Sequence, residues 1–435
     1  MNVTAKRVLA SAIVLGLLGW LGCSDSEPQI ERDAEVVEED SGPEFVAWER
    51  SSEGSGGMQW LRGDLHVHAA GASNDAAPES THERIKEVAV ERGLDFVVLT
   101  DHSNSTGSDP WTLDEDPELF NQGPEFPFWD EVAELSTESF LLVQGNELSP
   151  VDPNTNQPTG HIGCIPRSLQ DFDPDIAFVD RPRGEVTGGE ALEQARDAGC
   201  LTILNHPYGP RWISFDWTGQ GYDAMEVWNG GAGFGLYDEQ GMQAWACDLS
   251  QGRKVTPIGA SDNHNVEMEP PGELLTPPLG VPVTWVWTAE VNWDEIIDGL
   301  SQGRVAISDT GAPLEIDLFD AEGRWMAMAG GEVGEAEDLW VQIRGARKES
   351  DGSRNLELIK VLPGACDDRR EEGRIIVPEA NWEVVETWSI DRAGEFEERV
   401  EVSLAEGEVL FAWMVPESIE LMGTDAAISG AIYAR

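Results

Sequence analysis

The chain has 435 residues, of which 40% are hydrophobic and 17 are Trp. At roughly 100 to 200 residues per domain, this length predicts two or three domains and excludes a single small module. The apolar content is enough for a large core, so a wholly disordered chain is excluded too. Lys and Arg total 28 against 82 Asp and Glu, which gives a formal net charge of −54. Because such a surface repels nucleic acids and anionic lipids, nucleic-acid binding is not expected.

The N-terminus has the pattern of an export signal. Two basic residues precede an apolar run from Val8 to Leu21, which is too short for a comfortable membrane span and typical of a secretory signal. The run ends in Trp20-Leu-Gly-Cys23, which resembles a bacterial lipoprotein box with Cys23 as the acylated residue. We therefore expect residues 1–23 to direct export to the bacterial cell envelope with a lipid anchor at Cys23. Plain secretion with an incidental cysteine is the alternative.

The segment 24–57 is polar and acidic and ends in a stretch rich in Ser and Gly. Low hydrophobicity and like charge do not offset the entropy lost on ordering, so we predict a flexible tether between the anchor and the folded protein. No later segment reaches the ~18 continuous apolar residues of a spanning helix. The lipid anchor is therefore the membrane attachment that we expect.

The seven histidines organise the middle of the chain, and all lie between His66 and His264. His66 and His68 alternate with apolar residues, and this period of two places both imidazoles on one face of a predicted strand. We therefore expect a strand here that carries polar side chains near its carboxyl end.

A predicted helix separates this strand from the next one. Ser80 and Glu83 have the spacing of a capping box at its start, and Gly93 stands at a C-cap position at its end. A buried strand over 96–99 follows and leads towards His102. Strand, helix and strand thus follow one another within a few tens of residues.

A hydrophobic strand followed by polar residues recurs along the chain. Thr187 and Glu190 open another capped helix. The further predicted strands, each with its polar residues, are 140–143 with Glu147, 161–165 beginning at His161, 201–204 with Asn205 and His206, 224–227 with Glu226 and Asn229, and 255–258 with Asp262 and His264. Alternating strands and helices predict parallel β/α architecture, and functional groups at the carboxyl ends of the strands predict a barrel whose mouth is the active site.

The residues at these strand ends are of the types that bind divalent cations. Imidazoles and carboxylates together suit zinc, manganese or iron better than calcium, which prefers oxygen alone. A single histidine is more often a surface or core residue than a ligand. Six of them beside Glu147 and Asp262 are different, because burying so many titratable groups without a cation costs several kcal/mol. We therefore predict two or three divalent metal ions.

The ordered motifs of this region resemble the PHP domain, the polymerase and histidinol phosphatase superfamily. The resemblance covers roughly Leu61 to Gly311 and rests on His66-Val-His68, Thr100-Asp-His102, Glu147, His161, Asn205-His206-Pro207 and Ser261-Asp-Asn-His264. The segment 226–229 and the predicted helix over 293–304 are similar to the carbaryl-hydrolase-like branch. The resemblance implies a distorted seven-stranded (β/α)7 barrel with up to three metal ions.

The resemblance also implies which residues bind each ion. The three sets are His66, His68, Glu147 and Asp262; then Glu147, His161 and His206; and then His102, His264 and a residue shortly after His68, for which Asp75 is the nearest candidate. Glu147 would thus bridge the first two ions.

The chemistry of such a site predicts hydrolysis by a metal-bridged hydroxide. Two cations about 3.5 to 4 Å apart can share a water and lower its pKa towards about 7. Asp262 and Glu147 are the predicted catalytic residues, with Asp262 orienting the water and receiving its proton. Arg211 is a candidate clamp for a substrate anion, and a structural ion pair is its equally weighted alternative. Asn229 is a candidate donor to the substrate, and a turn residue is its alternative.

Three functions stay open at this stage. The superfamily resemblance favours a phosphoesterase acting on a small-molecule ester. The closer branch and the acidic surface favour a carbamate, ester or amide hydrolase. The third is a non-catalytic surface lipoprotein that binds carbohydrate or matrix, and the nearly complete ligand set argues against it. The sequence does not predict the oligomeric state.

Several further residues are interpreted as structural. His82 is predicted to face solvent in the first turn of its helix, and Cys164 to be a small core residue. Trp212 and Trp217 are candidates for the pocket wall. The cysteines downstream of the signal allow three pairings, among which the sequence does not choose; they are Cys164, Cys200, Cys247 and Cys366.

After Gly311 the histidines stop and a different pattern begins. Alternating apolar residues recur in short runs over 314–318, 339–343, 356–361 and 400–404, between turns rich in Gly, Asp and Glu. This pattern is typical of an antiparallel β-sandwich. We therefore predict a barrel domain over 58–311 and an accessory sandwich domain over 312–435, which packs on or shapes the substrate site without a catalytic residue.

Overall fold

In the computed structural model, the described residues are 49–50, 56–73, 75–102, 125–149, 160–176, 187–210, 213–230, 234–269, 277–348, 352–366, 369–371, 374–416 and 425–435. The chain divides into two units, Met1–Ala47 and Trp48–Arg435, and every described residue belongs to the second. The expected signal peptide, its Cys23 and most of the expected tether lie outside the described residues. No helix within these ranges is long and apolar enough to cross a membrane.

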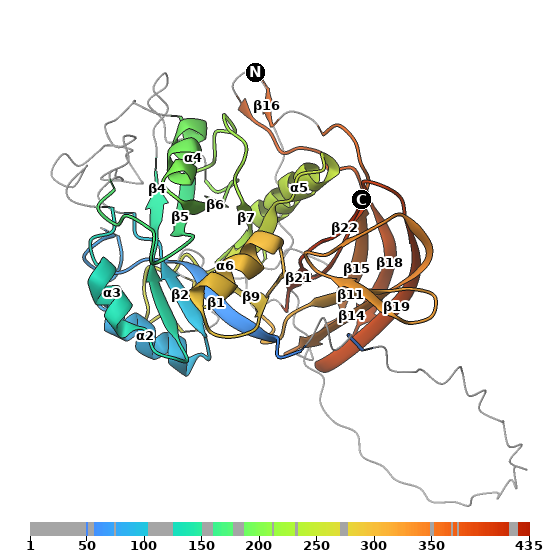
Figure 1. Ribbon diagram of the computed structural model, residues 1–435, viewed down its shortest axis with the longest axis horizontal. Helices are drawn as coiled ribbons and strands as arrows, with labels where there is room; N and C mark the ends of the chain where they lie inside the picture. The colour runs from blue at the N-terminus through green and yellow to red at the C-terminus, as the bar shows by residue number, and fades with distance from the viewer. Residues whose placement is uncertain are drawn as a thin grey trace, which may run out of the picture. The chain divides into compact units, whose positions relative to one another are not determined.

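The described part is a mixed α/β protein with many strands and few helices (Figure 1). Its helices are α2 (His82–Glu91), α3 (Trp129–Leu135), α4 (Gly188–Asp197), α5 (Leu236–Ser250) and α6 (Trp293–Gln302). The strands up to α6 and just after it are β1 (Gln59–Val67), β2 (Phe96–Leu99), β3 (Leu141–Gln144), β4 (Asn146–Leu148), β5 (His161–Pro166), β6 (Cys200–Asn205), β7 (Ala224–Asn229), β8 (Thr256–Ala260), β9 (Val283–Thr288) and β10 (Val305–Ser308). Each helix contacts a strand close to it in sequence, as α2 does with β2 and α5 with β7.

These strands belong to two sheets. In the first, β1, β2 and β3 are parallel, and β9 and β10 extend the sheet in antiparallel orientation. In the second, with the order β4-β5-β6-β7-β8, the strands β6, β7 and β8 are parallel, while β4 and β5 run antiparallel to their neighbours. A single isolated bridge between Val67 and Asn263 joins the two sheets near the ends of β1 and β8. No closed barrel is detected among the described strands, so the seven-stranded barrel stays a prediction.

The C-terminal part, as far as it is described, consists of strands. They are β11 (Glu315–Phe319), β12 (Trp325–Met328), β13 (Glu332–Val333), β14 (Ala336–Arg347), β15 (Arg354–Val361), β16 (Arg370–Glu371), β17 (Arg374–Ile375), β18 (Trp382–Ile390), β19 (Gly394–Leu404), β20 (Val409–Pro416), β21 (Ala427–Ser429) and β22 (Ile432–Ala434). One antiparallel sheet has the order β12-β11-β14-β19. The strands β15, β18, β20, β21 and β22 instead continue the sheet of β1, because β21 pairs with β10.

Apolar side chains of these two C-terminal layers share one core. Leu318 and Val341 come from one sheet, and Leu358 and Ala412 from the other. All four runs predicted from alternation are strands. What alternation does not predict is that one layer is continuous with the sheet of the first region, because pairing with β10 depends on contacts between distant segments.

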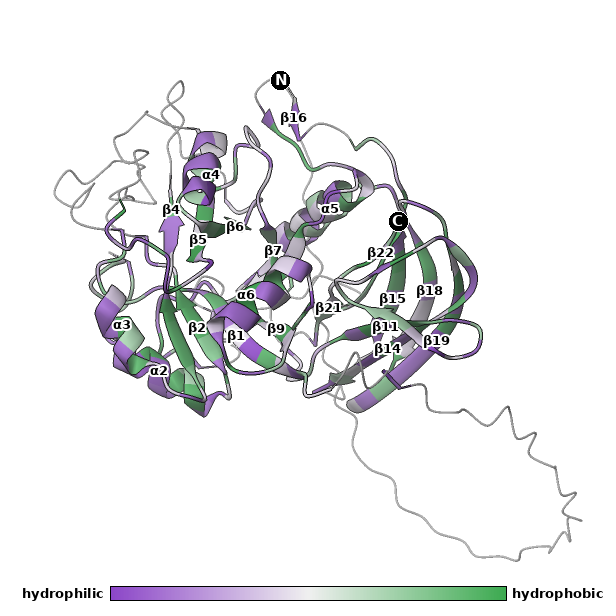
Figure 2. Ribbon diagram, in the orientation of Figure 1, coloured by the Kyte–Doolittle hydropathy of each residue, from purple (hydrophilic) through white to green (hydrophobic). Residues whose placement is uncertain are grey.

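Hydropathy explains how the elements pack. In α2 the apolar residues Ile85, Val88 and Ala89 are buried, because a spacing of three to four places them on one face. In β2 all four residues are buried. Figure 2 shows the difference, with β2 hydrophobic throughout and α2 hydrophobic on part of its surface. Strands covered on both faces hold their carboxyl ends in fixed positions, which a site built on them requires.

The ends of two helices follow their predicted signals. Thr187 and Glu190 form the capping box of α4, each side chain accepting the other's backbone N–H. Gly93 follows α2 with a φ of +72°, in the left-handed region that favours glycine. Both predictions are confirmed.

The start of α2 differs from its prediction. The N-cap is Thr81, not Ser80. Ser80 is buried, and its hydroxyl accepts the backbone N–H of Val266 at 3.1 Å and lies 3.4 Å from the His264 carbonyl oxygen. The predicted capping box with Glu83 is therefore wrong, because Ser80 joins the helix start to the segment after β8.

Candidate metal centre

The predicted ligands come from the ends of several strands and meet at one place. His66 lies in β1 and His68 follows that strand, whereas Glu147 and His161 lie in β4 and β5. His102, His206, Asp262 and His264 follow β2, β6 and β8, and Asp75 lies in the segment between β1 and α2. His161 begins β5, which runs antiparallel to β6, so it lies beside the end of β6, and across the cluster residues nearly 200 positions apart come within hydrogen-bond distance.

Glu147 lies at the centre of this cluster and is fully buried. Its Oε1 is 3.1 Å from His66 Nε2, 3.1 Å from His161 Nδ1 and 3.2 Å from His206 Nε2. Its Oε2 is 2.9 Å from His102 Nδ1. One carboxylate is thus shared by imidazoles from four different strands, as a bridging metal ligand would be.

Asp262 is the second carboxylate of the cluster. Its Oδ1 is 3.1 Å from His68 Nε2 and 3.2 Å from His66 Nε2, and its Oδ2 is 4.0 Å from His206 Nε2. The Asp262 side chain is 20% exposed, whereas that of Glu147 is not exposed at all. Asp262 and His206 also have positive φ values of +53° and +27°. Such strained backbone persists only where its surroundings hold it, and it is concentrated at functional sites.

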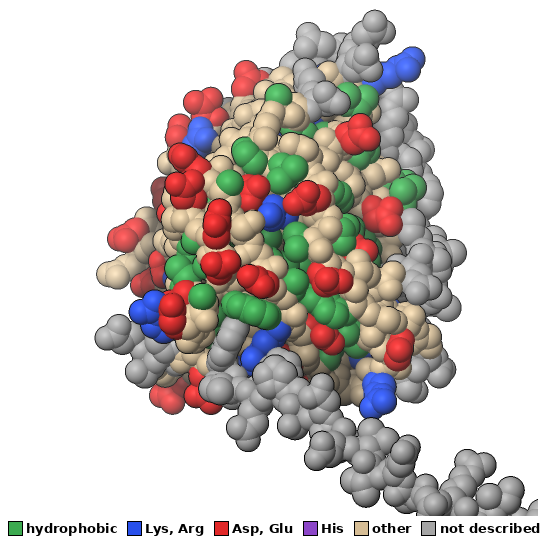
Figure 3. Space-filling view, turned by 90° about the vertical axis from the view of Figure 1, so that its right-hand side faces the viewer, with side chains coloured by type: hydrophobic (Ala, Val, Ile, Leu, Met, Phe, Trp, Pro, Cys, Tyr) green, Lys and Arg blue, Asp and Glu red, His purple; other side chains and the backbone are tan. Residues whose placement is uncertain are grey.

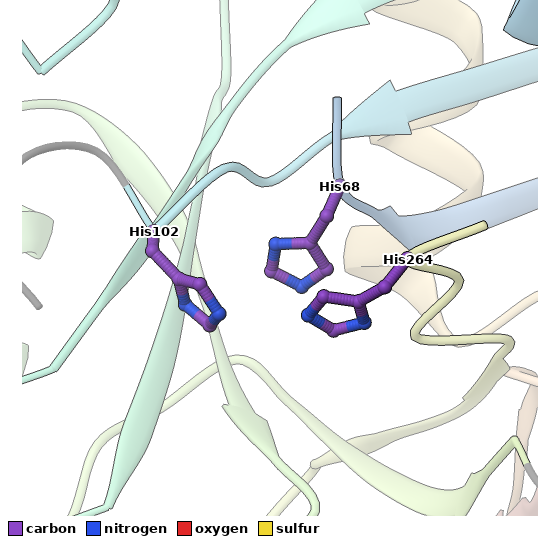
Figure 4. Close-up of side chains that lie close together, drawn as sticks. All are labelled: His68, His102 and His264. Carbon is purple, nitrogen blue, oxygen red and sulfur yellow. The ribbon is translucent and has the colours of Figure 1, made fainter. Parts of the chain in front are cut away.

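Asp75 joins the cluster next to a group of three imidazoles. Its Oδ2 is 3.3 Å from His102 Nε2 and 3.4 Å from His264 Nε2. The ring of His68 lies 4.3 Å from that of His102 and 3.9 Å from that of His264, centroid to centroid. Figure 4 shows these three imidazoles gathered around a common space. Asp75 therefore lies where the third predicted ligand set requires it.

The donor atoms fit a cation better than a network of hydrogen bonds. His66 Nε2, His161 Nδ1 and Glu147 Oε2 are buried, and although each lies 2.9 to 3.1 Å from a group of opposite charge, none of them meets it in hydrogen-bond geometry within the described residues. Buried polar atoms are normally paired, because an unpaired one costs about 1 to 3 kcal/mol. Four groups of three residues each have their ligand atoms within 4.8 Å of one another. They are His68, His102 and His264; His66, His68 and Glu147; His66, His206 and Asp262; and His102, Glu147 and His161. Divalent ions bound there would satisfy these atoms together.

Glu226 is a residue of this site that the sequence analysis did not assign. It is buried in β7, and its Oε1 is 2.8 Å from His66 Nδ1. Its Oε2 accepts the backbone N–H of His206 at 2.6 Å. The contact with Nδ1 leaves His66 Nε2 to face the cluster, and outer carboxylates orient metal-binding histidines in this way. An acid inside an otherwise apolar buried strand was the available signal, since such a group needs a partner.

The charges of the cluster shift its titration strongly. Burial opposes ionisation of Glu147 and Asp262, yet the surrounding imidazoles hold the pKa of both carboxyls well below their usual range. Burial and two neighbouring imidazoles lower the pKa of His68 to about 3. For His66, burial lowers the pKa, but the nearby carboxylates, Asp262 first, outweigh it and raise the pKa. The two acids and His68 thus have the deprotonated forms that metal ligands need.

The two predicted substrate-binding residues have different outcomes. Asn229 is the last residue of β7, and its Nδ2 donates to Glu226 Oε2 at 3.1 Å and to Asp262 Oδ2 at 3.4 Å. It therefore lies at the cluster, and its contact with a substrate stays a prediction. Arg211 lies outside the described residues.

His82 corrects a prediction. It is 4% exposed, its Nδ1 is 3.2 Å from Glu131 Oε1, and its ring meets Phe128 edge to face at 4.7 Å. The prediction that it faces solvent is wrong, because α3 and the residue before it pack against the start of α2. His82 belongs to none of the four ligand groups.

The four downstream cysteines form two disulfides. Cys164 pairs with Cys200 and joins β5 to β6, so it is buried as predicted but is not a free thiol. Cys247 of α5 pairs with Cys366, which precedes β16. Trp217 packs against Tyr208, Phe215 and Tyr222, and Trp212 lies outside the described residues.

Comparison with known proteins adds little to this geometry. No protein-family model and no curated protein matches the chain. Among solved structures, it is similar to a two-domain protein containing a predicted PHP-like metal-dependent phosphoesterase from Bacteroides vulgatus, with 15% identity, a TM-score of 0.39, and coverage of 86% of this chain and 94% of that chain. It is also similar to the lesion-specific endonuclease PfuEndoQ from Pyrococcus furiosus (16% identity, TM-score 0.37, 56% of each chain) and to PsfC from Pseudomonas syringae (16%, 0.33, 52% of this chain and 82% of that chain). Similarity at this level supports no argument about activity, so the function rests on the residues themselves.

Proposed function

We propose that this protein is a metal-dependent hydrolase that acts on a small phosphoester. The observation that supports this most directly is the environment of Glu147, which four imidazoles approach at 2.9 to 3.2 Å although several of the buried atoms do not meet in hydrogen-bond geometry. A purely structural network would pair these atoms with one another. The third possibility, a non-catalytic binding protein, does not account for a cluster of this composition.

The ligand sets are those that the family resemblance implies, and the short distances within the cluster support them. They would be His66, His68, Glu147 and Asp262 for one ion; Glu147, His161 and His206 for a second; and His102, His264 and Asp75 for a third. Zinc, manganese or iron bound there supplies Lewis acidity and lowers the pKa of water, which no described side chain can do alone. We infer no choice among these metals.

The residues of the chain have separate tasks in this proposal. Asp262 is the partly exposed carboxylate, and its Oδ2 is the atom that receives the proton of the attacking water. Asn229 donates to that oxygen and orients it. Glu147 is fully buried, so it holds the imidazoles together instead of exchanging protons with solvent. Glu226 fixes the ring of His66.

A carbamate, ester or amide is the second candidate substrate. The segment 226–229, on which the resemblance to the carbaryl-hydrolase-like branch depends, contributes both Glu226 and Asn229 to the cluster. A strongly acidic surface also disfavours polyanionic substrates. Figure 3 shows one face of the protein, on which Asp and Glu are more abundant than Lys and Arg. The local charge of bound cations outweighs this long-range effect, since the screening length is about 8 Å at physiological ionic strength.

Metal analysis followed by parallel assays tests the proposal. We expect at least one divalent ion per purified chain, and hydrolysis of bis-p-nitrophenyl phosphate that a chelator abolishes and Mn²⁺ or Zn²⁺ restores. Activity on 1-naphthyl N-methylcarbamate alone would favour the second candidate. Cleavage of duplex DNA would contradict the expectation that nucleic acid is not a substrate. Less than about one ion per chain, with no turnover on any of the three, would favour the binding protein.

Export and lipid anchoring belong to the same proposal. The disulfides Cys164–Cys200 and Cys247–Cys366 support an oxidising compartment such as the cell envelope. We expect the full chain in the membrane fraction through acylated Cys23, and Cys23→Ser in the soluble fraction. A full-length protein that stays in the soluble fraction would contradict lipid anchoring and favour plain secretion.

A further inference from the structure

The loop that follows β6 holds a proposed metal ligand in a strained conformation. His206 has a φ of +27°, and Trp217, further along the same connection, has a φ of +55°. Backbone in this region is strained for residues other than glycine and persists only when neighbouring groups fix it. Within the loop, His206 O accepts the N–H of Gly209 at 2.8 Å, and Pro207 O accepts the N–H of Phe215 at 3.1 Å. Glu226 Oε2 also accepts the N–H of His206 at 2.6 Å, and further support comes from a distant part of the chain.

That support is the β16–β17 hairpin with its flanking residues Arg369 and Ile376. The hydroxyl of buried Tyr208, two residues after His206, donates to the Ile376 carbonyl oxygen at 3.1 Å. The guanidinium carbon of Arg369 lies 4.6 Å from the ring centroid of Trp217. The rings of Tyr208 and Trp217 are 5.4 Å apart, so the hairpin touches these two aromatic residues of the loop and they touch each other.

Arg369 is itself held firmly. It is 6% exposed, its Nη1 donates to Tyr222 Oη at 3.2 Å, and its Nη2 donates to the Ala244 carbonyl oxygen at 2.9 Å and to the Asp248 carboxylate. The disulfide Cys247–Cys366 joins the same part of α5 to the start of this segment. The hairpin is therefore fixed to α5, and the loop after β6 is fixed to the hairpin.

We propose that Arg369 is a positioning residue for the metal centre, which acts through Trp217 and Tyr208 to keep His206 Nε2 directed at Glu147. The proposal rests on the metal centre proposed above. It gives the C-terminal part of the chain a task in metal binding, although no ligand comes from it. Arg369 stays about 160 residues from His206 in sequence, and only the packing brings the two into one network.

A matched pair of arginines allows a sharp test. Arg253 also pairs with Asp248, at 2.9 Å, and also contacts Tyr222, with its guanidinium carbon 4.6 Å from the ring centroid. The ring under the Arg253 guanidinium is therefore Tyr222, whereas the ring under that of Arg369 is Trp217. Either arginine can be replaced while the other still neutralises buried Asp248, so neither variant leaves that charge unpaired. Arg369→Met and Arg253→Met thus differ in the contact with Trp217.

The full chain, freed of metal by chelation, is titrated with Zn²⁺ alone. Arg369→Met is expected to weaken the binding that involves His206 by about ten-fold, the size seen when outer partners of metal ligands are lost. Arg253→Met is expected to bind as the unaltered chain does. In a His206→Ala background, Arg369→Met is expected to have no further effect. Activity of Arg369→Met at limiting Zn²⁺ should fall and return when Zn²⁺ is in excess, which a general loss of folded protein would not produce.

Equal Zn²⁺ affinity in Arg369→Met and the unaltered chain would overturn the proposal, and so would equal losses in the two arginine variants. If Arg369→Met does not fold, Tyr208→Phe replaces it, because that change removes only the bond to Ile376 and should weaken the same site. Hydrogen exchange in the metal-free chain separates this proposal from the proposed function. Faster exchange of the Gly209 and Phe215 amides in Arg369→Met supports positioning even if no metal binds, and unchanged exchange overturns it.

Discussion

Two fully buried carboxylates, one in each region of the protein, have opposite surroundings. Glu147 lies among four imidazoles, and its Oε2 is 2.9 Å from His102 Nδ1 without hydrogen-bond geometry. Asp317 in β11 accepts from Arg50 at 2.7 and 2.9 Å, from Arg344 at 2.9 Å and from Trp325 at 2.9 Å. Both acids are 0% exposed.

The difference shows what makes a buried acid a site. A guanidinium is always charged and offers N–H donors alone, so Asp317 and its arginines form a closed network that needs no further ion. An imidazole can give up its proton and then offers a lone pair, so the surroundings of Glu147 can bind a cation. The residues around a buried carboxylate, more than its burial, therefore distinguish a metal centre from a structural ion pair.

The largest effect is expected from removing an imidazole of the cluster. His68→Ala should lose bound metal and lower turnover by roughly a thousand-fold or more, as removal of one member of a catalytic constellation does. His82→Ala, which removes a buried imidazole outside the cluster, should retain the metal content. Metal analysis and kcat measured on both variants test whether His68 is a metal ligand. Unchanged turnover in His68→Ala would contradict the first ligand set.

Breaking the closed network should affect stability and leave the metal in place. Asp317→Asn leaves buried Arg50 with Glu315 as its remaining partner, at 2.6 Å. We expect the free energy of unfolding to fall by about 3 to 5 kcal/mol, because loss of one member leaves a buried charge undercompensated. Urea unfolding gives the size of the change, and metal content should equal that of the unaltered chain. Lower metal content would mean that the two regions are not separate in function.

Asp309, beyond β10, is a buried acid with weaker compensation. Burial raises its pKa to about 7, nearby Asp425 adds to the rise, and the Ala426 N–H and Lys348 reduce it. A raised pKa in the folded state means that folding favours the protonated form, so stability from this group falls as the pH rises from about 4 to about 7. Asp309→Asn should remove about 2 kcal/mol of the loss in stability between pH 5 and pH 8.

Urea unfolding at both pH values, compared between the unaltered chain and Asp309→Asn, measures this effect. Two parallel pH profiles would show that Asp309 titrates normally.

The smallest effect is expected at Glu226, which touches ligands but is not one. Glu226→Gln keeps the shape of the side chain and removes the charge opposite His66 Nδ1, so Zn²⁺ affinity should fall by roughly 10- to 100-fold. The control is Asp238→Asn, because burial raises the pKa of this nearby acid, and the oxygen of its neutral replacement keeps one of the two bonds that Asp238 accepts from the Asn229 and Gly235 amides. Zn²⁺ competition titration compares the two. Equal affinities would remove Glu226 from the site.

Much of the candidate site follows from local pattern. Alternation over His66 and His68, and polar residues placed just after apolar runs, depend on the two-residue period of a strand and on the fact that parallel strands end on one side of a sheet. These rules act within a few residues, and they predict Glu147 and Asp262 as metal ligands from the sequence alone. The strands of the C-terminal part follow from the same period.

The sequence by itself determined which residue types stand at the strand ends and therefore which chemistry they offer. The tertiary structure decided what local rules do not reach: that Glu226 meets His66, that His82 is covered by α3, that Cys164 pairs with Cys200, and that β21 extends the sheet of β1. Each of these depends on which distant segments pack together, because burial and pairing are fixed by the lowest free energy of the whole chain, whereas period and capping are fixed by neighbours.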